Sequence, residues 1–241
     1  MIAALYVETN GVYYGLPDVD PWDEERDARL YAGPWPVVAH PPCERWSVLA
    51  PLVEKTHGYI VGDDGGKFAA ALSAVRRWGG VIEHPAFSYA WWAFDLPKPP
   101  RGMGWQYGLC GGASCYIEQW HYGHRAIKPT WLYAYGQEAL PRLKWHEPPP
   151  TLTPAYVTDG GGDIKRKSGK VPDPARQRLG KREASATTPE VPDFWGFGHI
   201  ISELRSDPAG GIVAKRVEHP PHMAGIVELL PAPLDRDRGN L

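Results

Sequence analysis

Three short apolar segments near the beginning of the chain each end abruptly, and this pattern limits the fold more than any other feature. The segments cover residues 2–7, 36–39 and 81–82. The second stops at His40-Pro41-Pro42-Cys43, and the third runs into Glu83-His84-Pro85. Short apolar segments of this kind are typical of buried strands. They predict a sheet whose polar residues gather at the ends of its strands.

The clearest helix is predicted over Lys67–Trp78, between the second and third of these segments. Its apolar residues recur at intervals of three and four, which forms one stripe along a helix, and Gly79-Gly80 ends it. A shorter helix is predicted over residues 23–31, and further strands over residues 115–119 and 130–135. This order predicts an open α/β sheet, in which sites lie outside the carboxyl ends of the strands.

The character of the chain changes after residue 136. Residues 137–180 contain three consecutive prolines, three consecutive glycines and a run of basic residues, which is typical of a long irregular insertion. Apolar residues return in the segment that follows. We therefore predict an α/β core over residues 1–136, a basic insertion over 137–180, and a C-terminal segment over 181–241 that packs back on the core.

The composition limits the partners that the protein can have. The formal net charge of −2 gives no overall attraction to a polyanion, so contact with nucleic acid would depend on local basic patches. Three cysteines cannot all pair, no signal peptide is recognisable, and no segment approaches the roughly 20 apolar residues of a membrane span. We expect a cytoplasmic protein without a membrane or an obligate protein partner.

The residue types that modify a pyrimidine at C5 follow one another along the chain. A thiolate that adds to C6 makes C5 reactive, an acid beside N3 neutralises the resulting charge, and a cation holds the ring. Cys43 and Glu83 follow the second and third apolar segments, and Arg125 and Lys128 come just before the last predicted strand. We predict that these four residues are catalytic.

The sequence around these residues resembles the DNA cytosine-5 methyltransferase family. VVAHPPCERWS resembles the loop in which Pro-Cys follows a strand and carries the nucleophile, and Glu83-His84-Pro85 resembles the Glu-Asn-Pro motif whose Glu protonates the ring. Tyr122-Gly123, Arg125 and the strand after them resemble the family's Tyr-Gly and Gln-x-Arg-x-Arg strand pair. RLGKREASATTPEVPDFW is faintly similar to a helix after the target-recognition region. The convincing part covers residues 36–135.

The resemblance implies a three-layer α/β fold with a mostly parallel, Rossmann-like methyltransferase sheet, shortened in its N-terminal half. It implies an enzyme, similar to bacteriophage DNA-modification proteins, that flips a cytosine from DNA and transfers a methyl group from S-adenosylmethionine to C5. The cofactor-binding residues would be Tyr6, Glu8, Asn10, Gly11 and Asp20. The substrate-binding residues would be Pro42, Arg45, His84 and His124, together with Lys165, Arg166 and Lys167 as phosphate contacts in the basic insertion.

Several alternatives remain open at this point. Only two glycines of the family's glycine-rich cofactor loop are present, so a folate donor that gives hydroxymethylcytosine, or deamination, would use the same covalent step. The protein could instead be a non-catalytic nucleic-acid-binding module or a zinc-stabilised one, because Cys110, Cys115, His121 and His124 are zinc-ligand types. Their spacing fits no common zinc finger, and we predict no metal site. His40 or Arg45 is expected to lower the pKa of Cys43.

Overall fold

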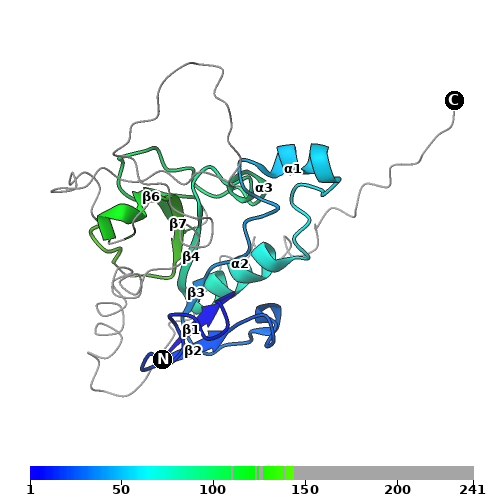
Figure 1. Cartoon of the computed structure of the whole chain (residues 1–241). Coiled ribbons are helices and arrows are strands. Elements are labelled where there is room, and N and C mark those ends of the chain that lie inside the picture. Colours follow the sequence, from blue (N-terminus) through cyan, green and yellow to red (C-terminus); the bar gives the residue numbers. More distant parts are fainter. Residues whose placement is uncertain (110, 123, 125–126, 138, 144–241) are drawn as a thin grey trace, which may run out of the picture. The chain divides into compact units, whose positions relative to one another are not determined.

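The computed structural model describes residues 1–109, 111–122, 124, 127–137 and 139–143 (Figure 1). These residues form a seven-stranded sheet in the order β2-β1-β3-β4-β7-β6-β5. The strands are β1 (Ile2–Leu5), β2 (Val19–Trp22), β3 (Val37–Ala39), β4 (Gly80–Pro85), β5 (Gln106–Tyr107), β6 (Ala113–Glu118) and β7 (Pro129–Tyr135). The α-helices are α1 (Ala50–His57), α2 (Lys67–Trp78) and α3 (Ala90–Ala93), and the 3-10 turns are η1 (Ala28–Leu30) and η2 (Gln119–Tyr122).

The sheet is mixed, although most of its strands point the same way. β1 pairs in parallel with β2 and β3, and β3 pairs in parallel with β4. β7 lies antiparallel between β4 and β6, and β5 lies antiparallel to β6. β6 therefore has the direction of β4, and five of the seven strands, β2, β1, β3, β4 and β6, share one direction. The predicted α/β sheet is confirmed; its antiparallel part was not predicted.

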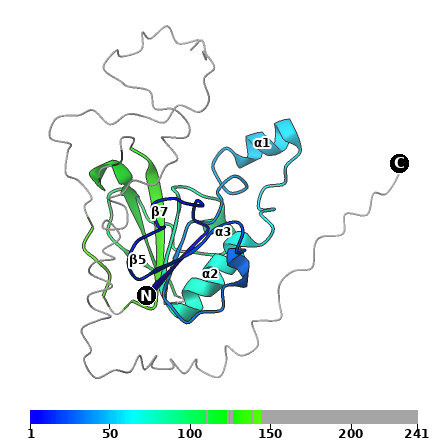
Figure 2. The same cartoon turned by 60° about the horizontal axis from the view of Figure 1, so that its bottom comes forward.

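One face of the sheet is covered by α2. The helix contacts β3, β4 and β7, and it lies along the sheet in both views (Figure 1, Figure 2). Its predicted apolar stripe is buried, and Phe68 and Val75 are fully inaccessible to solvent. They pack in one cluster with Leu5 and Ile82, which alternate along their strands with residues of the other face. The hydrophobic effect on this stripe holds the helix to the sheet.

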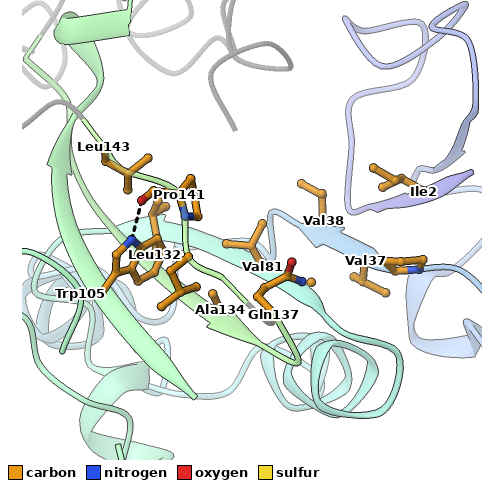
Figure 3. Close-up of a pocket in the computed structure, with 13 residues that line it drawn as sticks. Ile2, Val37, Val38, Val81, Trp105, Leu132, Ala134, Gln137, Pro141 and Leu143 are labelled. Atoms are coloured by element: carbon orange, nitrogen blue, oxygen red, sulfur yellow. Dashed lines mark hydrogen bonds between the residues drawn. The ribbon is translucent and has the colours of Figure 1, made fainter. Parts of the chain in front are cut away.

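The other face of the sheet carries a second apolar cluster. Ile2, Val38, Val81 and Leu132 point to this face, and Figure 3 shows them in an apolar pocket together with Pro141. Loop residues cover part of it, and no helix lies against it within the described part of the chain. The described part of the chain therefore does not contain the predicted third layer. The C-terminal segment over 181–241, like residues 144–180 of the basic insertion, falls outside the described residues.

The structure differs from the prediction in three elements. The helix expected over residues 23–31 is only the single turn η1, because the carboxylate of Asp23 accepts the backbone N–H groups of Glu25 and Arg26 and closes a turn instead. β2 was not predicted, and it contains Pro21, which an edge strand tolerates. α1 was also missed, since only its first residue, Ala50, is buried and it carries no apolar stripe.

The glycine pair after α2 has two structural roles. Gly79 ends the helix with a φ of 76°, in the region that favours glycine. Gly80 begins β4, and a Cβ atom there would lie 1.9 Å from the carbonyl oxygen of Val37 on β3. Only glycine allows the two strands this approach, so the pair both stops the helix and aligns β4 with β3.

Candidate functional site at the carboxyl edge of the sheet

The carboxyl ends of β1, β3, β4 and β6 meet at one edge of the sheet, where β7 begins. Polar side chains from all of these elements gather at this edge. They come from the loop after β1, the residues after β3, the end of β4, the first turn after β6 and the start of β7. These side chains are Tyr13, His40, Cys43, Glu83, Gln119, Lys128 and Thr130.

Glu83 is the centre of this group. Its Oε1 accepts a hydrogen bond from Nε2 of Gln119 at 2.9 Å, and its Oε2 lies 3.1 Å from Nδ1 of His40. Nε2 of Gln119 also lies 3.0 Å from the hydroxyl oxygen of Thr130. Only 13% of the Glu83 side chain is exposed. The carboxylate is therefore fixed by donors on both of its oxygens.

Glu83 is ionised in this environment. Burial by itself would raise its pKa, but the hydrogen bond with His40 and the positive charge of Lys128 outweigh burial and lower the pKa to about 2. A carboxyl group with this pKa carries no proton near neutral pH. It can accept a hydrogen bond from a ligand at once, whereas it can protonate a ligand only after receiving a proton itself.

His40 connects Glu83 to the loop after β1. Its backbone N–H donates to the carbonyl of Leu5 at 3.0 Å, which continues the pairing of β3 with β1 by one residue. Its Nε2 lies 2.7 Å from the hydroxyl oxygen of Tyr13, whose ring is buried against the imidazole. The imidazole thus has a polar partner on each nitrogen, and its orientation is fixed from both sides.

Cys43 lies three residues after His40 in a tight turn. Its carbonyl accepts the backbone N–H groups of Trp46 at 3.0 Å and Ser47 at 2.8 Å, and its thiol is partly exposed. Burial and then the negative charge of Glu83 raise the pKa of the thiol, while Lys128 lowers it. The expectation that His40 or Arg45 would lower this pKa is wrong, because the negative charge of Glu83 acts on the thiol in the opposite direction.

Lys128 is the cation that acts on both groups. It precedes β7 in a left-handed conformation with a φ of 40°. Its carbonyl accepts the backbone N–H of Gln119 at 3.3 Å and the hydroxyl of Thr130 at 3.0 Å. The positive charge favours the ionised forms of Glu83 and of Cys43 alike. Three of the four predicted catalytic residues are therefore brought together, whereas Arg125 lies outside the described residues.

His84 is buried beneath this edge and is not exposed to a ligand, in contrast to its predicted contact with the substrate. Successive side chains of a strand point to opposite faces, so His84 points to the α2 face while Glu83 does not. It is fully buried between Phe68 and Trp91. Burial lowers its pKa to about 4. Neither ring nitrogen makes a hydrogen bond of normal geometry within the described part of the structure.

The other predicted substrate residues lie around the Cys43 turn or outside the described part. Pro42 and Arg45 line a small polar pocket that also contains Lys67, and the guanidinium of Arg45 lies 3.9 Å from the centre of the Tyr59 ring. His124 is buried, and its backbone N–H donates to the carbonyl of Gln119. The predicted phosphate contacts fall outside the described residues; they are Lys165, Arg166 and Lys167.

The predicted cofactor residues lie in the loop after β1 and on β2, and the side chains of two of them, Tyr6 and Asp20, are hydrogen-bonded within the protein. The hydroxyl of Tyr6 donates to the carbonyl of Lys67 at 3.0 Å. The backbone N–H of Gly11 donates to the carbonyl of Glu8, closing a turn that contains Asn10. Asp20 accepts hydrogen bonds from Arg26 at 2.6 Å and Trp22 at 2.8 Å.

Asp23, which directly follows β2, is also hydrogen-bonded within the protein. Asp23 is buried and accepts the hydroxyls of Thr9 and Tyr14 together with two backbone N–H groups. A cluster that includes Val7 and Tyr13 packs the same loop onto Ala4 of β1. Tyr6, Asp20 and Asp23 are thus hydrogen-bonded to neighbouring residues, whereas the side chains of Glu8 and Asn10 are exposed.

The described residues also bear on the zinc alternative. Cys115 is fully buried on β6 in one cluster with Ile117 and Leu132, and burial raises the pKa of its thiol. Cys110 lies outside the described residues. No group of three or more His, Cys, Asp or Glu side chains is arranged to hold a metal ion among those described.

Four residues of this edge were not predicted as parts of the site. His40 directly precedes the Pro41-Pro42-Cys43 turn, so its place after a predicted strand was a usable signal. Gln119 and Thr130 occupy the facing ends of two predicted strands, where side chains meet. No sequence pattern pointed to Tyr13, because the apolar residues of its loop do not recur at a regular spacing.

Comparisons with known proteins identify no family for this chain. The chain matches no model of a protein family, no curated protein and no solved structure. None of the helices in the described part is both long and apolar enough to span a membrane.

Proposed function

We propose that the protein binds a pyrimidine base of DNA, with cytosine as the preferred base, and forms a covalent bond from Cys43 to C6 of the ring. One observation carries the proposal. A partly exposed thiol, a buried carboxylate and a lysine from three distant parts of the sequence lie at one sheet edge and influence one another electrostatically. These are the groups that nucleophilic activation of a pyrimidine requires.

Each group has a separate task in this reaction. The thiolate of Cys43 adds to C6, and the electrons of the C5–C6 double bond move toward N3. Glu83 contacts N3 and the exocyclic group at C4, while Lys128 stabilises the thiolate before addition and the negative charge of the ring afterwards. Gln119 and His40 keep the Glu83 carboxylate in position. C5 of the adduct is then nucleophilic and exchanges its hydrogen with solvent.

The proposal stops at activation of C5. Methyl transfer is what the family resemblance implies, and S-adenosylmethionine would supply an electrophilic methyl group if it were bound. Tyr6 and Asp20, two of the residues predicted to hold it, are hydrogen-bonded within the protein, and no step of the proposed reaction depends on this cofactor. Mass spectrometry of nucleosides from DNA of cells that express the protein distinguishes methylation, hydroxymethylation and deamination.

Covalent trapping tests the proposal without any donor. In 5-azacytosine a nitrogen replaces C5, which makes C6 more electrophilic. Single-stranded and duplex oligonucleotides that contain this base between degenerate flanks are incubated with the protein. We expect an adduct that survives denaturing electrophoresis and adds the mass of the oligonucleotide. Cys43→Ser should abolish the adduct, and Glu83→Gln should slow its formation by about 10²-fold.

Cys110→Ser is the matched control, because it removes a different thiol and should leave the adduct unchanged. The proposal is wrong if the wild-type protein forms no adduct with either oligonucleotide, or if the adduct persists in Cys43→Ser. Binding of DNA without any adduct would instead favour a non-catalytic nucleic-acid-binding module.

A further inference from the structure

The state of Glu83 raises a question that the proposed reaction leaves open. Addition of a thiolate to C6 places negative charge on N3, and a proton at N3 stabilises the adduct. The residue beside the ring must deliver that proton. Glu83, with its pKa near 2, carries no proton when the base arrives. Another group must therefore supply it.

His40 is the titratable group in direct contact with the carboxylate. Its Nδ1 lies 3.1 Å from Oε2 of Glu83, and only 14% of its side chain is exposed. Imidazole is the side chain that most often transfers protons in proteins, because each of its two nitrogens can hold or release one. The hydrogen bond between them is a direct path for a proton from the imidazole to the carboxylate.

Tyr13 holds the imidazole in the orientation that this path requires. Its hydroxyl oxygen lies 2.7 Å from Nε2 of His40, and its ring is 5% exposed. When His40 is protonated, Nε2–H donates to the Tyr13 oxygen while Nδ1–H donates to Glu83. When His40 is neutral with its proton on Nδ1, the Tyr13 hydroxyl donates to Nε2 instead. The same geometry serves both protonation states.

We infer that His40, oriented by Tyr13, is the proton carrier of this site: it passes a proton through Glu83 to N3 of the pyrimidine as Cys43 adds to C6. This inference rests on the proposed function; it makes His40 a carrier of protons as well as a partner of Glu83, and it adds Tyr13 as a positioning residue. Neither residue touches the base. Both act through the carboxylate of Glu83.

The Cys43 thiol first loses its proton to solvent. Its sulfur then forms a bond to C6, and the electron pair of the C5–C6 double bond moves onto the ring system that ends at N3. One proton moves from Nδ1 of His40 to Oε2 of Glu83, and one moves from the Glu83 carboxyl group to N3. His40 ends neutral, and reversal of the addition returns the proton along the same path.

Other charged and titratable groups face this pair among the described residues. Lys128 and His84 favour the ionised form of Glu83, and Cys43 lies close enough for its thiol to respond to the charge of Glu83. Tyr13 faces His40 from the loop after β1. The pH dependence of the reaction therefore combines two opposite requirements, a deprotonated Cys43 and a protonated His40.

The pH profile of adduct formation with the 5-azacytosine oligonucleotide tests the inference. The wild-type rate should rise by much less than tenfold for each pH unit, because the reaction needs a proton relayed through His40 as well as the thiolate. In His40→Gln, the rate near pH 7 should fall by about 10²-fold and then rise about tenfold for each pH unit, following the thiolate alone. The difference between the two proteins should disappear as the pH rises.

Tyr13→Phe removes only a hydroxyl group and tests the orienting role separately. We expect a rate about tenfold lower near neutral pH, with a profile between those of the wild type and His40→Gln. His57→Gln, at an exposed position at the end of α1, is the matched control and should behave as the wild type.

The outcomes separate this inference from the proposed function. If the wild-type protein forms no adduct, the proposed function fails. If the adduct forms but His40→Gln lowers its rate by the same factor at every pH, or not at all, His40 is structural and only the proton-carrier inference fails. Equal profiles of Tyr13→Phe and the wild type would remove Tyr13 from the inference.

Discussion

At the scale of single residues, the surroundings of Cys43 keep its thiol in the protonated, less reactive form. Burial and the charge of Glu83 raise the pKa of the Cys43 thiol, so most of it is protonated near neutral pH. Lys128 acts in the opposite direction on the same thiol. A base that contacts Glu83 would shield its negative charge and so lower the pKa of the Cys43 thiol. The reactive thiolate would therefore form mainly when a substrate is bound.

This balance predicts opposite effects of two substitutions on the alkylation of Cys43 by iodoacetamide. Glu83→Gln removes a negative charge, lowers the pKa of the thiol and should increase the rate at pH 7 several-fold. Lys128→Met removes the positive charge, raises the pKa and should decrease the rate several-fold. Both substitutions are made in a protein that already carries Cys110→Ser. Mass spectrometry of peptides then measures the alkylation of Cys43 separately from that of the buried Cys115.

Glu24→Gln, an exposed acid in the loop after β2, is the control and should leave the rate unchanged. A fall in the alkylation rate of Glu83→Gln would contradict the electrostatic account of Cys43. Since thiolate is the reactive form, the rate of every variant should rise with pH until its thiol is fully ionised.

At the scale of elements, the sequence predicted those parts whose pattern is local. α2 has the predicted bounds, Lys67–Trp78, because an apolar stripe and a glycine stop are both visible along the chain. The strands β1, β3, β4, β6 and β7 were found to within a few residues for the same reason. α1 and β2 carry no such pattern, since one is largely exposed and the other is an edge strand.

The start of α2 depends on one side chain that its stripe does not reveal. The carboxylate of Asp64 accepts the backbone N–H groups of Gly66, Lys67 and Phe68, and it also accepts the indole N–H of Trp46 at 2.8 Å. Asp64→Ala leaves these donors without their acceptor, so we expect a loss of about 1–2 kcal/mol in the free energy of unfolding.

Urea denaturation at pH 7 measures this loss. The neighbouring exposed Asp63 provides the matched control, and Asp63→Ala should change the free energy of unfolding by less than about 0.5 kcal/mol. Equal effects of the two substitutions would show that Asp64 does not cap the helix.

At the scale of the whole molecule, the sheet brings together residues that are far apart in the sequence. Cys43, Glu83 and Lys128 meet because β3, β4 and β6 end at the edge where β7 begins. Their order along the chain predicted this meeting, since the carboxyl ends of parallel strands share one edge. Gln119 reaches Glu83 only because β7 runs antiparallel between β4 and β6, and no pattern along the chain indicated that arrangement.

The burial of His84 makes the stability of the whole molecule dependent on pH. Its pKa falls from an ordinary 6.5 to about 4 on folding, so the unfolded chain takes up the proton first as the pH decreases. This contribution is complete above pH 6.5 and is lost between pH 6.5 and 4. From pH 7 to 5 the wild-type protein should lose about 2 kcal/mol through this residue. Glu83 contributes only at lower pH, between its ordinary 4.5 and about 2.

Urea midpoints at pH 7 and pH 5 test this dependence. His84→Asn should be less stable than the wild type at pH 7, but it should lose much less stability on going to pH 5. His57→Gln, which changes an exposed histidine, should keep the wild-type dependence. The same loss in His84→Asn as in the wild type would assign the acid sensitivity to another group.

The sequence by itself determined the α/β character, the position of α2 and the order of Cys43, Glu83 and Lys128 at strand ends, because period, stop signals and order are local properties of a chain. Only the tertiary structure decided which neighbours these residues have. The alternation of β4 separated Glu83 from His84, and the antiparallel β7 brought Gln119 to Glu83. Packing of the loop after β1 placed Tyr13 against His40, and hydrogen bonds to neighbouring segments engaged Tyr6 and Asp20. Such contacts depend on register and packing between distant segments, and no local pattern records them.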